Sequence, residues 1–273
     1  MHPTIVDFGP FALHSYGLMM TLAFIVGIWL AGRRARAAGL PERFAFDISF
    51  VIIVVSLICA RLTYVVTHWN EFAGHPFDII SPIQHDGTIG IAGLVLLGGV
   101  IGGVIAAYAY ARAKKLPLFL VFDVLTPSLV IGIAIGRIGC FLNGCCFGFP
   151  TNLPWGCVFP ENSLAGSVYP HTHIHPTQLY EMALMFLLFV ALLRFDRIRH
   201  PQGRTFALFL MAYGVARVWI EGLRWYEADK IAGYIGSYRL TGSQIASAVM
   251  FFAGLFLWSY VAKKKSPERK RAT

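Results

Sequence analysis

The sequence predicts an all-α integral membrane protein with seven transmembrane helices and an irregular loop region on the outer side. The composition is the first observation that predicts this, because the 273 residues are 56% hydrophobic and only 14% charged, with a mean hydropathy of +0.62. Soluble domains carry about a quarter charged residues. A helix needs about 20 mostly apolar residues to span a bilayer. The expected spans are 15–31, 45–67, 89–111, 118–137, 178–195, 204–222 and 241–261.

The distribution of basic residues is the second observation, and it predicts the orientation. Basic clusters follow the first, third, fifth and seventh spans, whereas segments 1–14, 68–88 and 143–177 contain no Lys or Arg. Cytoplasmic loops are enriched in Lys and Arg, so we expect the N-terminus outside and the C-terminus in the cytoplasm. The loop 223–240 departs from the pattern, with three basic residues partly offset by two acidic ones. This arrangement favours a lipid bilayer over nucleic acid as the partner of a chain with net charge +9.

The domain organisation follows from the same spans. We expect one polytopic membrane domain over 1–273, with a loop-rich periplasmic cap at 143–177 and a basic cytoplasmic tail at 262–273.

The third observation is a set of charged residues inside the spans, where such residues are functional by default. In the sixth span Tyr213, Arg217 and Glu221 recur every four residues, and Arg224 follows. This spacing places them on one helical face and allows Arg217 to pair with Glu221. A structural ion pair with an interfacial anchor at Arg224 is the alternative to a cationic binding site.

Two further spans bring arginines to the same outer side. Arg61 and Tyr64 lie near the end of the second span, and Arg137 lies at the end of the fourth. Arg61 alone is also explained by a side chain that extends towards water. Guanidinium groups at one depth repel each other in a low dielectric unless an anion joins them, and phosphate matches their fork. We therefore expect a site for a phospholipid head group.

Glycines in the third span indicate close packing between helices. Gly98 and Gly99 each precede another glycine by four residues, a spacing that lets backbones approach. A backbone-lined cavity near 97–103, with Gly98 and Gly99 as substrate-binding residues, is the alternative.

Four cysteines, Cys140, Cys145, Cys146 and Cys157, are expected at or beyond the outer face, where disulfides are permitted. Disulfides or inert thiols are the favoured interpretation. A metal site with His171, His173 and His175 is an alternative, although the spacing matches no known finger or ribbon. A reactive thiol is another, because Cys140 and Cys145 flank Arg137 and a nearby cation lowers the pKa of a thiol. We expect no metal and no cofactor.

Seven segments resemble one known family in order along the chain. They are "SYGLMM" (15–20), "ARLTYV" (60–65), "GGVIGG" (98–103), "GRIGCFLNGCCFG" (136–148), "PWGCVFP" (154–160), "HPTQLYE" (175–181) and "YGVARVWIEGLR" (213–224). Together they resemble the prolipoprotein diacylglyceryl transferases of the bacterial inner membrane.

The resemblance implies a transferase whose active site faces the periplasm. It would move the diacylglyceryl group of phosphatidylglycerol to the lipobox cysteine thiol in the signal peptide of a prolipoprotein, with release of glycerol phosphate. Arg137 and Arg217 would bind the phosphoglycerol, and Glu221 would position Arg217. The other residues that fall on functional positions are Tyr16, Asn143 and Gly148.

The sequence departs from the family pattern at three positions. Cys140 stands where the family usually has asparagine, Cys145 where it has glutamate, and Leu97 where many members carry a histidine proposed as the base. The proton of the acceptor thiol would then pass to another group. The candidates are Glu221, Tyr16, His175 and bulk water.

Three other functions stay open at this point. One is a divergent paralogue with a different acceptor, and another is a thiol-based or metal-binding membrane protein that uses the outer cysteines. The third is a transporter, although transporters favour internal repeats and broken helices, and we find no convincing repeat.

Overall fold

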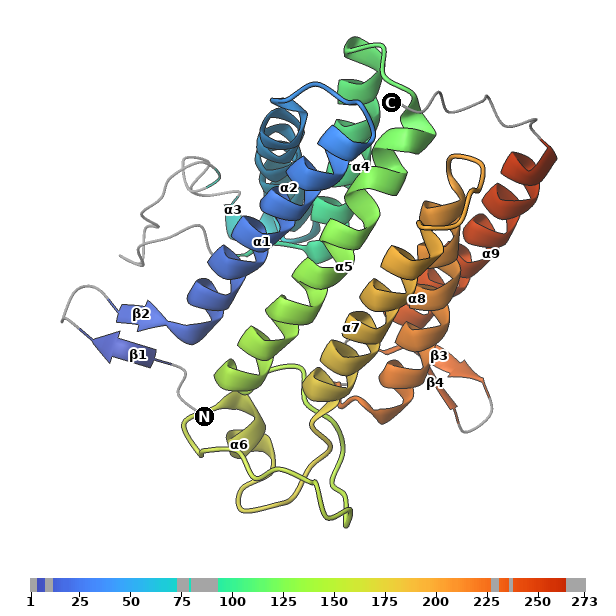
Figure 1. Cartoon of the computed structure of the whole chain (residues 1–273). Helices are drawn as coiled ribbons and strands as arrows, with labels where there is room; N and C mark the ends of the chain where they lie inside the picture. Colours follow the sequence, from blue (N-terminus) through green and yellow to red (C-terminus); the bar gives the residue numbers. More distant parts are fainter. Residues whose placement is uncertain are drawn as a thin grey trace. The chain divides into compact units, whose positions relative to one another are not determined.

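A computed structural model of the chain describes residues 4–7, 12–72, 79, 93–226, 231–235 and 238–263. Within these described residues, seven helices are long and apolar enough to cross a membrane, which confirms the seven expected spans (Figure 1). They are α1 (Ser15–Ala37), α2 (Phe44–Thr67), α4 (Leu96–Ala113), α5 (Leu118–Asn143), α7 (Thr177–Phe195), α8 (Arg204–Leu223) and α9 (Gly242–Lys263). The chain is therefore a multi-pass membrane protein.

Backbone conformation explains two of the helix ends that differ from the expected spans. Helix α4 begins at Leu96 rather than at 89, because Gly93 has a φ of 76° and Val95 is extended; residues 89–92 lie outside the described residues. Helix α5 continues past 137 to Asn143 and ends at Gly144, which has a φ of 71°. Glycine in the left-handed region is a common helix stop.

In the described part of the chain, the short elements are two helices and two antiparallel hairpins. The helices are α3 (Trp69–Phe72) and α6 (Leu164–Val168). The hairpins pair β1 (Thr4–Asp7) with β2 (Ala12–His14), and β3 (Ile231–Ile235) with β4 (Tyr238–Thr241). The all-α fold class is confirmed for the spans, and the hairpins are additions that the sequence pattern did not predict. The orientation of the termini and the single-domain organisation stay predictions, and residues 264–273 of the tail lie outside the described residues.

The chain divides into two compact units. One comprises 32–121, and the other comprises 1–31 with 122–273. Within the first, α2 packs along α4. A Cβ atom added to Gly98 would lie 2.1 Å from Oγ1 of Thr63, and one added to Gly102 would lie 2.6 Å from Cβ of Cys59. The close approach of these two helices therefore requires Gly98 and Gly102, which supports the packing interpretation of the glycine pairs.

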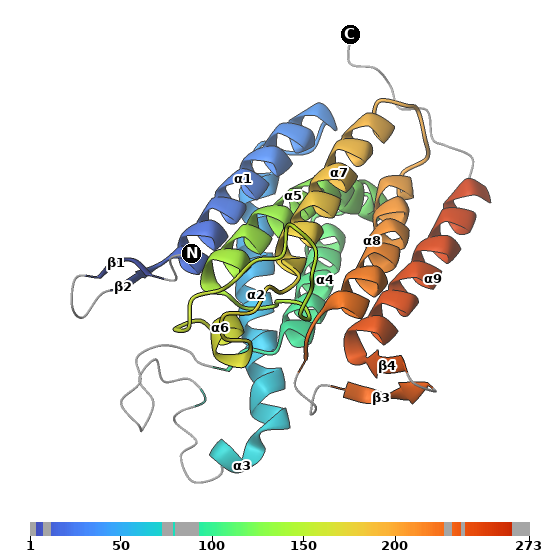
Figure 2. The same cartoon turned by 90° about the horizontal axis from the view of Figure 1, so that it is seen from below.

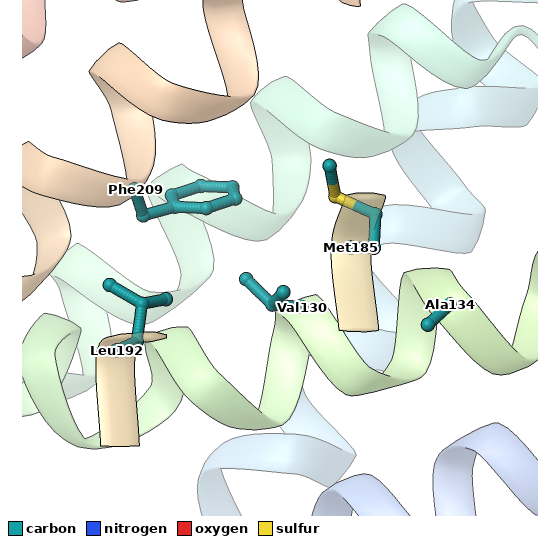
Figure 3. Packing of buried hydrophobic residues seen from close by; sticks show 5 residues of the cluster. All are labelled: Val130, Ala134, Met185, Leu192 and Phe209. Carbon is teal, nitrogen blue, oxygen red and sulfur yellow. The ribbon is translucent and has the colours of Figure 1, made fainter. Parts of the chain in front are cut away.

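The larger unit has its core between α5, α7 and α8. Val130 and Ala134 of α5, Met185 and Leu192 of α7 and Phe209 of α8 form one buried cluster (Figure 3). Helix α8 packs along both α7 and α9. These contacts fix the relative heights of the polar residues on the three helices.

The loop between α5 and α7 is an ordered cap on one end of this unit (Figures 1 and 2). Phe147, Phe159, Ala165 and Ile174 form a second buried cluster, and the ring of Trp225 stacks on Phe147 at 5.3 Å between centroids. Gly148 pairs with Arg224 in an isolated antiparallel bridge. The end of α5, the start of α7 and the end of α8 are thus held together.

Candidate active site

A chain of alternating charges connects three helices beneath the cap. Glu181, in the second turn of α7, is buried and forms ion pairs on both sides. Its Oε1 lies 2.9 Å from Nη2 of Arg137 on α5, and its Oε2 lies 2.9 Å from Nη1 of Arg217 on α8. Arg217 continues to Glu221, with Nη2 3.0 Å from Oε2. The predicted Arg217–Glu221 pair is therefore present, and Arg137 joins it through Glu181.

Hydroxyl groups fix the far end of this network. Thr241 donates its hydroxyl hydrogen to Oε1 of Glu221 at 2.8 Å. Arg217 donates from Nε to Oγ of Ser243 at 3.2 Å and from Nη2 to the hydroxyl of Tyr226 at 3.4 Å. Hydrogen bonds to charged groups are the stronger kind. They restrict the guanidinium of Arg217 to one orientation.

Glu181 changes the electrostatic argument made from the sequence. The sequence argument held that a bound phosphate is needed to offset the repulsion between guanidinium groups. In the structure, the Glu181 carboxylate already lies between Arg137 and Arg217. Each 2.9 Å contact is worth roughly 6 kcal/mol of attraction at an effective dielectric constant of about 20. The cost of desolvating buried ions offsets much of this. The four groups together carry no net charge.

Arg224 supplies an excess cation next to the network. It follows the last residue of α8, and its guanidinium lies 4.8 Å from the centroid of the Tyr226 ring. Its Nε is buried and has no hydrogen-bond partner among the described residues. With Arg224 included, the described residues of the site comprise three arginines and two carboxylates, which gives them a net charge of +1. One monoanion, such as a phosphodiester, balances it.

Four other predicted site residues lie in the same unit. Tyr16 is in the first turn of α1, and Tyr213 lies one turn before Arg217, with its ring 5.5 Å from that of Phe209. Asn143 is the last residue of α5. At Gly148 an added Cβ would lie 2.6 Å from Cβ of His175, so only glycine fits there without displacement. The functional roles assigned to these residues stay predictions.

Arg61, Tyr64, Gly98, Gly99 and Leu97 belong to the other unit. Arg61 is buried, and it donates from Nε to the carbonyl of Ile79 at 3.1 Å and from Nη1 to the carbonyl of Gly93 at 3.4 Å. Its guanidinium lies 5.8 Å from the centroid of the Tyr64 ring. The convergence of Arg61 with Arg137 and Arg217 stays a prediction, as does substrate binding by Tyr64, Gly98 and Gly99.

The loop histidines have separate partners. Nδ1 of His175 lies 3.2 Å from the hydroxyl of Tyr180, which also accepts a hydrogen bond from Nε1 of Trp155 at 2.8 Å. His173 contacts the carbonyl of Gly156, and His171 pairs with Glu161. In the described part of the chain no histidine shares a candidate metal cluster with the cysteines. The role of His175 as a base stays a prediction.

All five cysteines lie in the described ranges, and all are free thiols. The Sγ atoms of Cys140, Cys145 and Cys146 lie within 4.8 Å of one another. Nη1 of Arg137 lies 3.8 Å from Sγ of Cys140, so this cluster adjoins the charged network. The thiol of Cys157 instead faces the carbonyl of Trp155 at 3.7 Å, and burial raises its pKa.

Three buried residues at the start of α7 are missing from the set expected from the sequence. Glu181 connects the two arginines, and Thr177 and Gln178 hold the cysteine loop through hydrogen bonds to the carbonyls of Cys146 and Cys145. A signal for Glu181 was available, because it is an ionisable residue inside an apolar span. Thr177 and Gln178 carry no comparable charge signal, but all three residues lie in the segment "HPTQLYE" (175–181), which resembles the family.

Comparison with known proteins is consistent across the whole chain. The family model described as prolipoprotein diacylglyceryl transferase matches residues 3–260. Proteins named phosphatidylglycerol–prolipoprotein diacylglyceryl transferase are similar to this chain over nearly their whole length. That of Nostoc sp. (strain PCC 7120 / SAG 25.82 / UTEX 2576) is 33% identical, over 97% of this chain and 92% of the relative. That of Clostridium tetani (strain Massachusetts / E88) is 30% identical, over 95% and 97%. The chain belongs to the prolipoprotein diacylglyceryl transferase family.

Proposed function

We propose that this protein transfers the sn-1,2-diacylglyceryl group of phosphatidylglycerol to the lipobox cysteine of a prolipoprotein. The observation that carries the proposal is the buried network Arg137–Glu181–Arg217–Glu221, with the excess cation of Arg224 beside it, in a membrane-spanning member of this family. A lipid phosphodiester is the anion that matches both the net charge of +1 and the position within the membrane.

The reaction exchanges one bond for another at a glycerol carbon. The sulfur of the acceptor attacks this carbon, a carbon–sulfur bond forms, and the carbon–oxygen bond to the phosphate breaks. The bonding electrons leave with the phosphate oxygen, which finally takes up the proton that the thiol has lost. Glycerol phosphate and a thioether are the products, and no further reactant is needed.

The arginines stabilise the charge that develops on the leaving group. Preorganised donors aimed at developing charge supply a large share of catalysis. Arg137 and Arg217 come from different helices, and Glu181 determines the separation of their guanidinium groups. Glu181 and Glu221 are thus positioning residues, whereas the arginines contact the phosphate. Holding the thiol and the carbon in line supplies a further part of the rate.

We also propose that the protein lies in the bacterial inner membrane with this site towards the periplasm. Arg194 lies in the last turn of α7 and Lys263 ends α9, whereas Glu181 and Ser243 lie near the starts of the same helices. The basic ends of helices face the cytoplasm in the usual arrangement, and the charged network would then lie at the outer ends. Phosphatidylglycerol and the signal peptide of the prolipoprotein would then both enter sideways from the bilayer.

Purified protein in phosphatidylglycerol vesicles tests the proposal. A lipobox peptide is expected to gain the mass of a diacylglyceryl group, and a peptide with serine in place of its cysteine is expected to gain none. Arg137→Ala should abolish the gain, whereas Arg194→Ala, a matched control at the opposite end of α7, should keep it. Full transfer by the Arg137 variant would contradict the assignment.

Complementation tests in cells whether the protein transfers the diacylglyceryl group to prolipoproteins. The wild-type chain should restore growth to a strain depleted of its own transferase. Consumption of phosphatidylglycerol without modification of any lipobox peptide, together with failed complementation, would instead indicate a paralogue with another acceptor.

A further inference from the structure

The three clustered thiols are held in place by both ends of the cap. Cys140 is in the last turn of α5, one turn after Arg137, and the left-handed Gly144 reverses the chain so that Cys145 donates its backbone N–H to the carbonyl of Cys140 at 3.1 Å. The next residue, Cys146, has a φ of 63°. A non-glycine residue in this conformation is strained and persists only where the surroundings impose it.

The first turn of α7 holds Cys146 in this left-handed conformation. Thr177 donates its hydroxyl hydrogen to the carbonyl of Cys146 at 2.8 Å, and Gln178 donates from Nε2 to the carbonyl of Cys145 at 2.7 Å. Both donors are only 1% exposed. The backbone of the two adjacent cysteines is therefore fixed from outside the loop, and their side chains converge on Cys140 without forming a disulfide.

The separation of the sulfur atoms fits a metal ion. With zinc–sulfur bonds of about 2.3 Å, the sulfur atoms of a tetrahedral site lie about 3.8 Å apart. The three Sγ atoms lie within 4.8 Å of one another, so a contraction of about 1 Å or less through side-chain rotation reaches this geometry. Soft thiolate ligands select zinc and other thiophilic ions over magnesium and calcium.

The charge of such a site is balanced locally. Three thiolates and a Zn²⁺ ion carry a net charge of −1, and the guanidinium of Arg137 lies 3.8 Å from Sγ of Cys140. Buried charges require a partner of opposite sign. Arg137 already pairs with Glu181, so the zinc site would draw on the excess positive charge of the arginine network. The thiol protons pass to solvent when the ion binds.

We propose that Cys140, Cys145 and Cys146 bind a zinc ion with an open fourth position, and that this position takes the acceptor thiol of the prolipoprotein. The first part stands on the three sulfur atoms alone, whereas the second part rests on the proposed function. Zinc sites with three protein ligands keep a position for water or substrate, and a coordinated thiol is deprotonated. Arg137 adjoins both the cysteines and Glu181, so the bound thiolate would lie beside the head group whose carbon it attacks.

Metal binding is tested first, with protein that carries no histidine tag and has been purified under reducing conditions. We expect equimolar zinc by elemental analysis. In the Co²⁺-loaded protein we expect the near-ultraviolet charge-transfer absorption of thiolate–cobalt bonds. Cys145→Ser should lose both signals, whereas Cys157→Ser, a cysteine of the same cap outside the cluster, should keep both. Cys145→His retains a ligand and should keep binding with a shifted spectrum, which separates loss of the site from misfolding.

The acceptor is tested on the same Co²⁺-loaded protein. A lipobox peptide should intensify the charge-transfer band because a further thiolate joins the ion, and the serine peptide should leave the band unchanged. A spectrum that the cysteine peptide does not alter would overturn the second part. A disulfide between any two of the three cysteines in wild-type protein, or binding of Cu⁺ but of neither Zn²⁺ nor Co²⁺, would overturn the first.

Activity separates this proposal from the proposed function. If transfer proceeds at the wild-type rate in Cys145→Ser and in the presence of a strong chelator, the zinc ion does not hold the acceptor thiol, so the second part is wrong and the transferase stands. If the wild-type chain binds zinc but never modifies a lipobox peptide, the metal site stands and the transferase is wrong.

Discussion

Substitution of Glu181 by glutamine tests whether one carboxylate holds the charged network together. Glu181 contacts two guanidinium groups at 2.9 Å and is 3% exposed. Breaking a buried ion pair by removing one partner costs about 3–5 kcal/mol, because the other charge is left uncompensated. Glutamine keeps the volume but turns an amide donor towards Arg137 or Arg217. We expect a loss of stability at the upper end of this range.

The assay is thermal unfolding in detergent at a fixed scan rate. At about 2–4 °C per kcal/mol for a chain of this size, Glu181→Gln should lower the apparent Tm by roughly 10–20 °C. Glu221 contacts one arginine and the hydroxyl of Thr241, so Glu221→Gln should cost about half as much. Glu161→Gln removes an exposed pair with His171 and should change Tm by about 2 °C or less. An unchanged Tm in Glu181→Gln, or an equal loss in Glu161→Gln, would refute the reasoning.

Three further predictions concern the network, the cap and the loop between α7 and α8. Arg137→Lys keeps the charge but loses the planar fork, so the transfer rate measured by peptide mass should fall about 100-fold; a rate within twofold of wild type would count against bidentate phosphate binding. An added methyl at Gly148 would lie 2.6 Å from a neighbouring side chain, so Gly148→Ala should cost about 1–3 kcal/mol in thermal unfolding. Gly222→Ala, where nothing lies within 4 Å, should cost nothing, and equal losses would contradict the packing argument. The hydrogen bond to Asp196 raises the pKa of His200 above its ordinary value of 6.5. The stabilisation of wild type over His200→Gln should therefore be full below pH 6.5 and disappear as pH rises through the raised pKa; a Tm difference that does not change with pH would exclude this.

The sequence was sufficient for the spans because hydropathy and charge act locally along the chain. It also predicted the Arg217–Glu221 pair, because a spacing of four residues determines which side chains meet on one helix. The β3–β4 hairpin was missed, since its strands are short and lie in a segment assigned to a loop between spans.

The centre of the site was harder to predict because its residues meet only after the helices pack. Glu181 connects α5 to α8, and neither partner is on its own helix. The three cysteines follow no regular spacing, and their convergence depends on the left-handed turn at Gly144 and on hydrogen bonds from Thr177 and Gln178. Spacing along the chain therefore did not predict this cluster of thiols.

The most direct test of the central claim is to count both products of one reaction. Wild-type protein, phosphatidylglycerol and a lipobox peptide should yield glycerol phosphate and lipidated peptide in equal amounts, and Arg217→Ala should yield neither. Lipidated peptide without glycerol phosphate, or undiminished yields from the Arg217 variant, would contradict a transfer reaction that depends on this buried arginine.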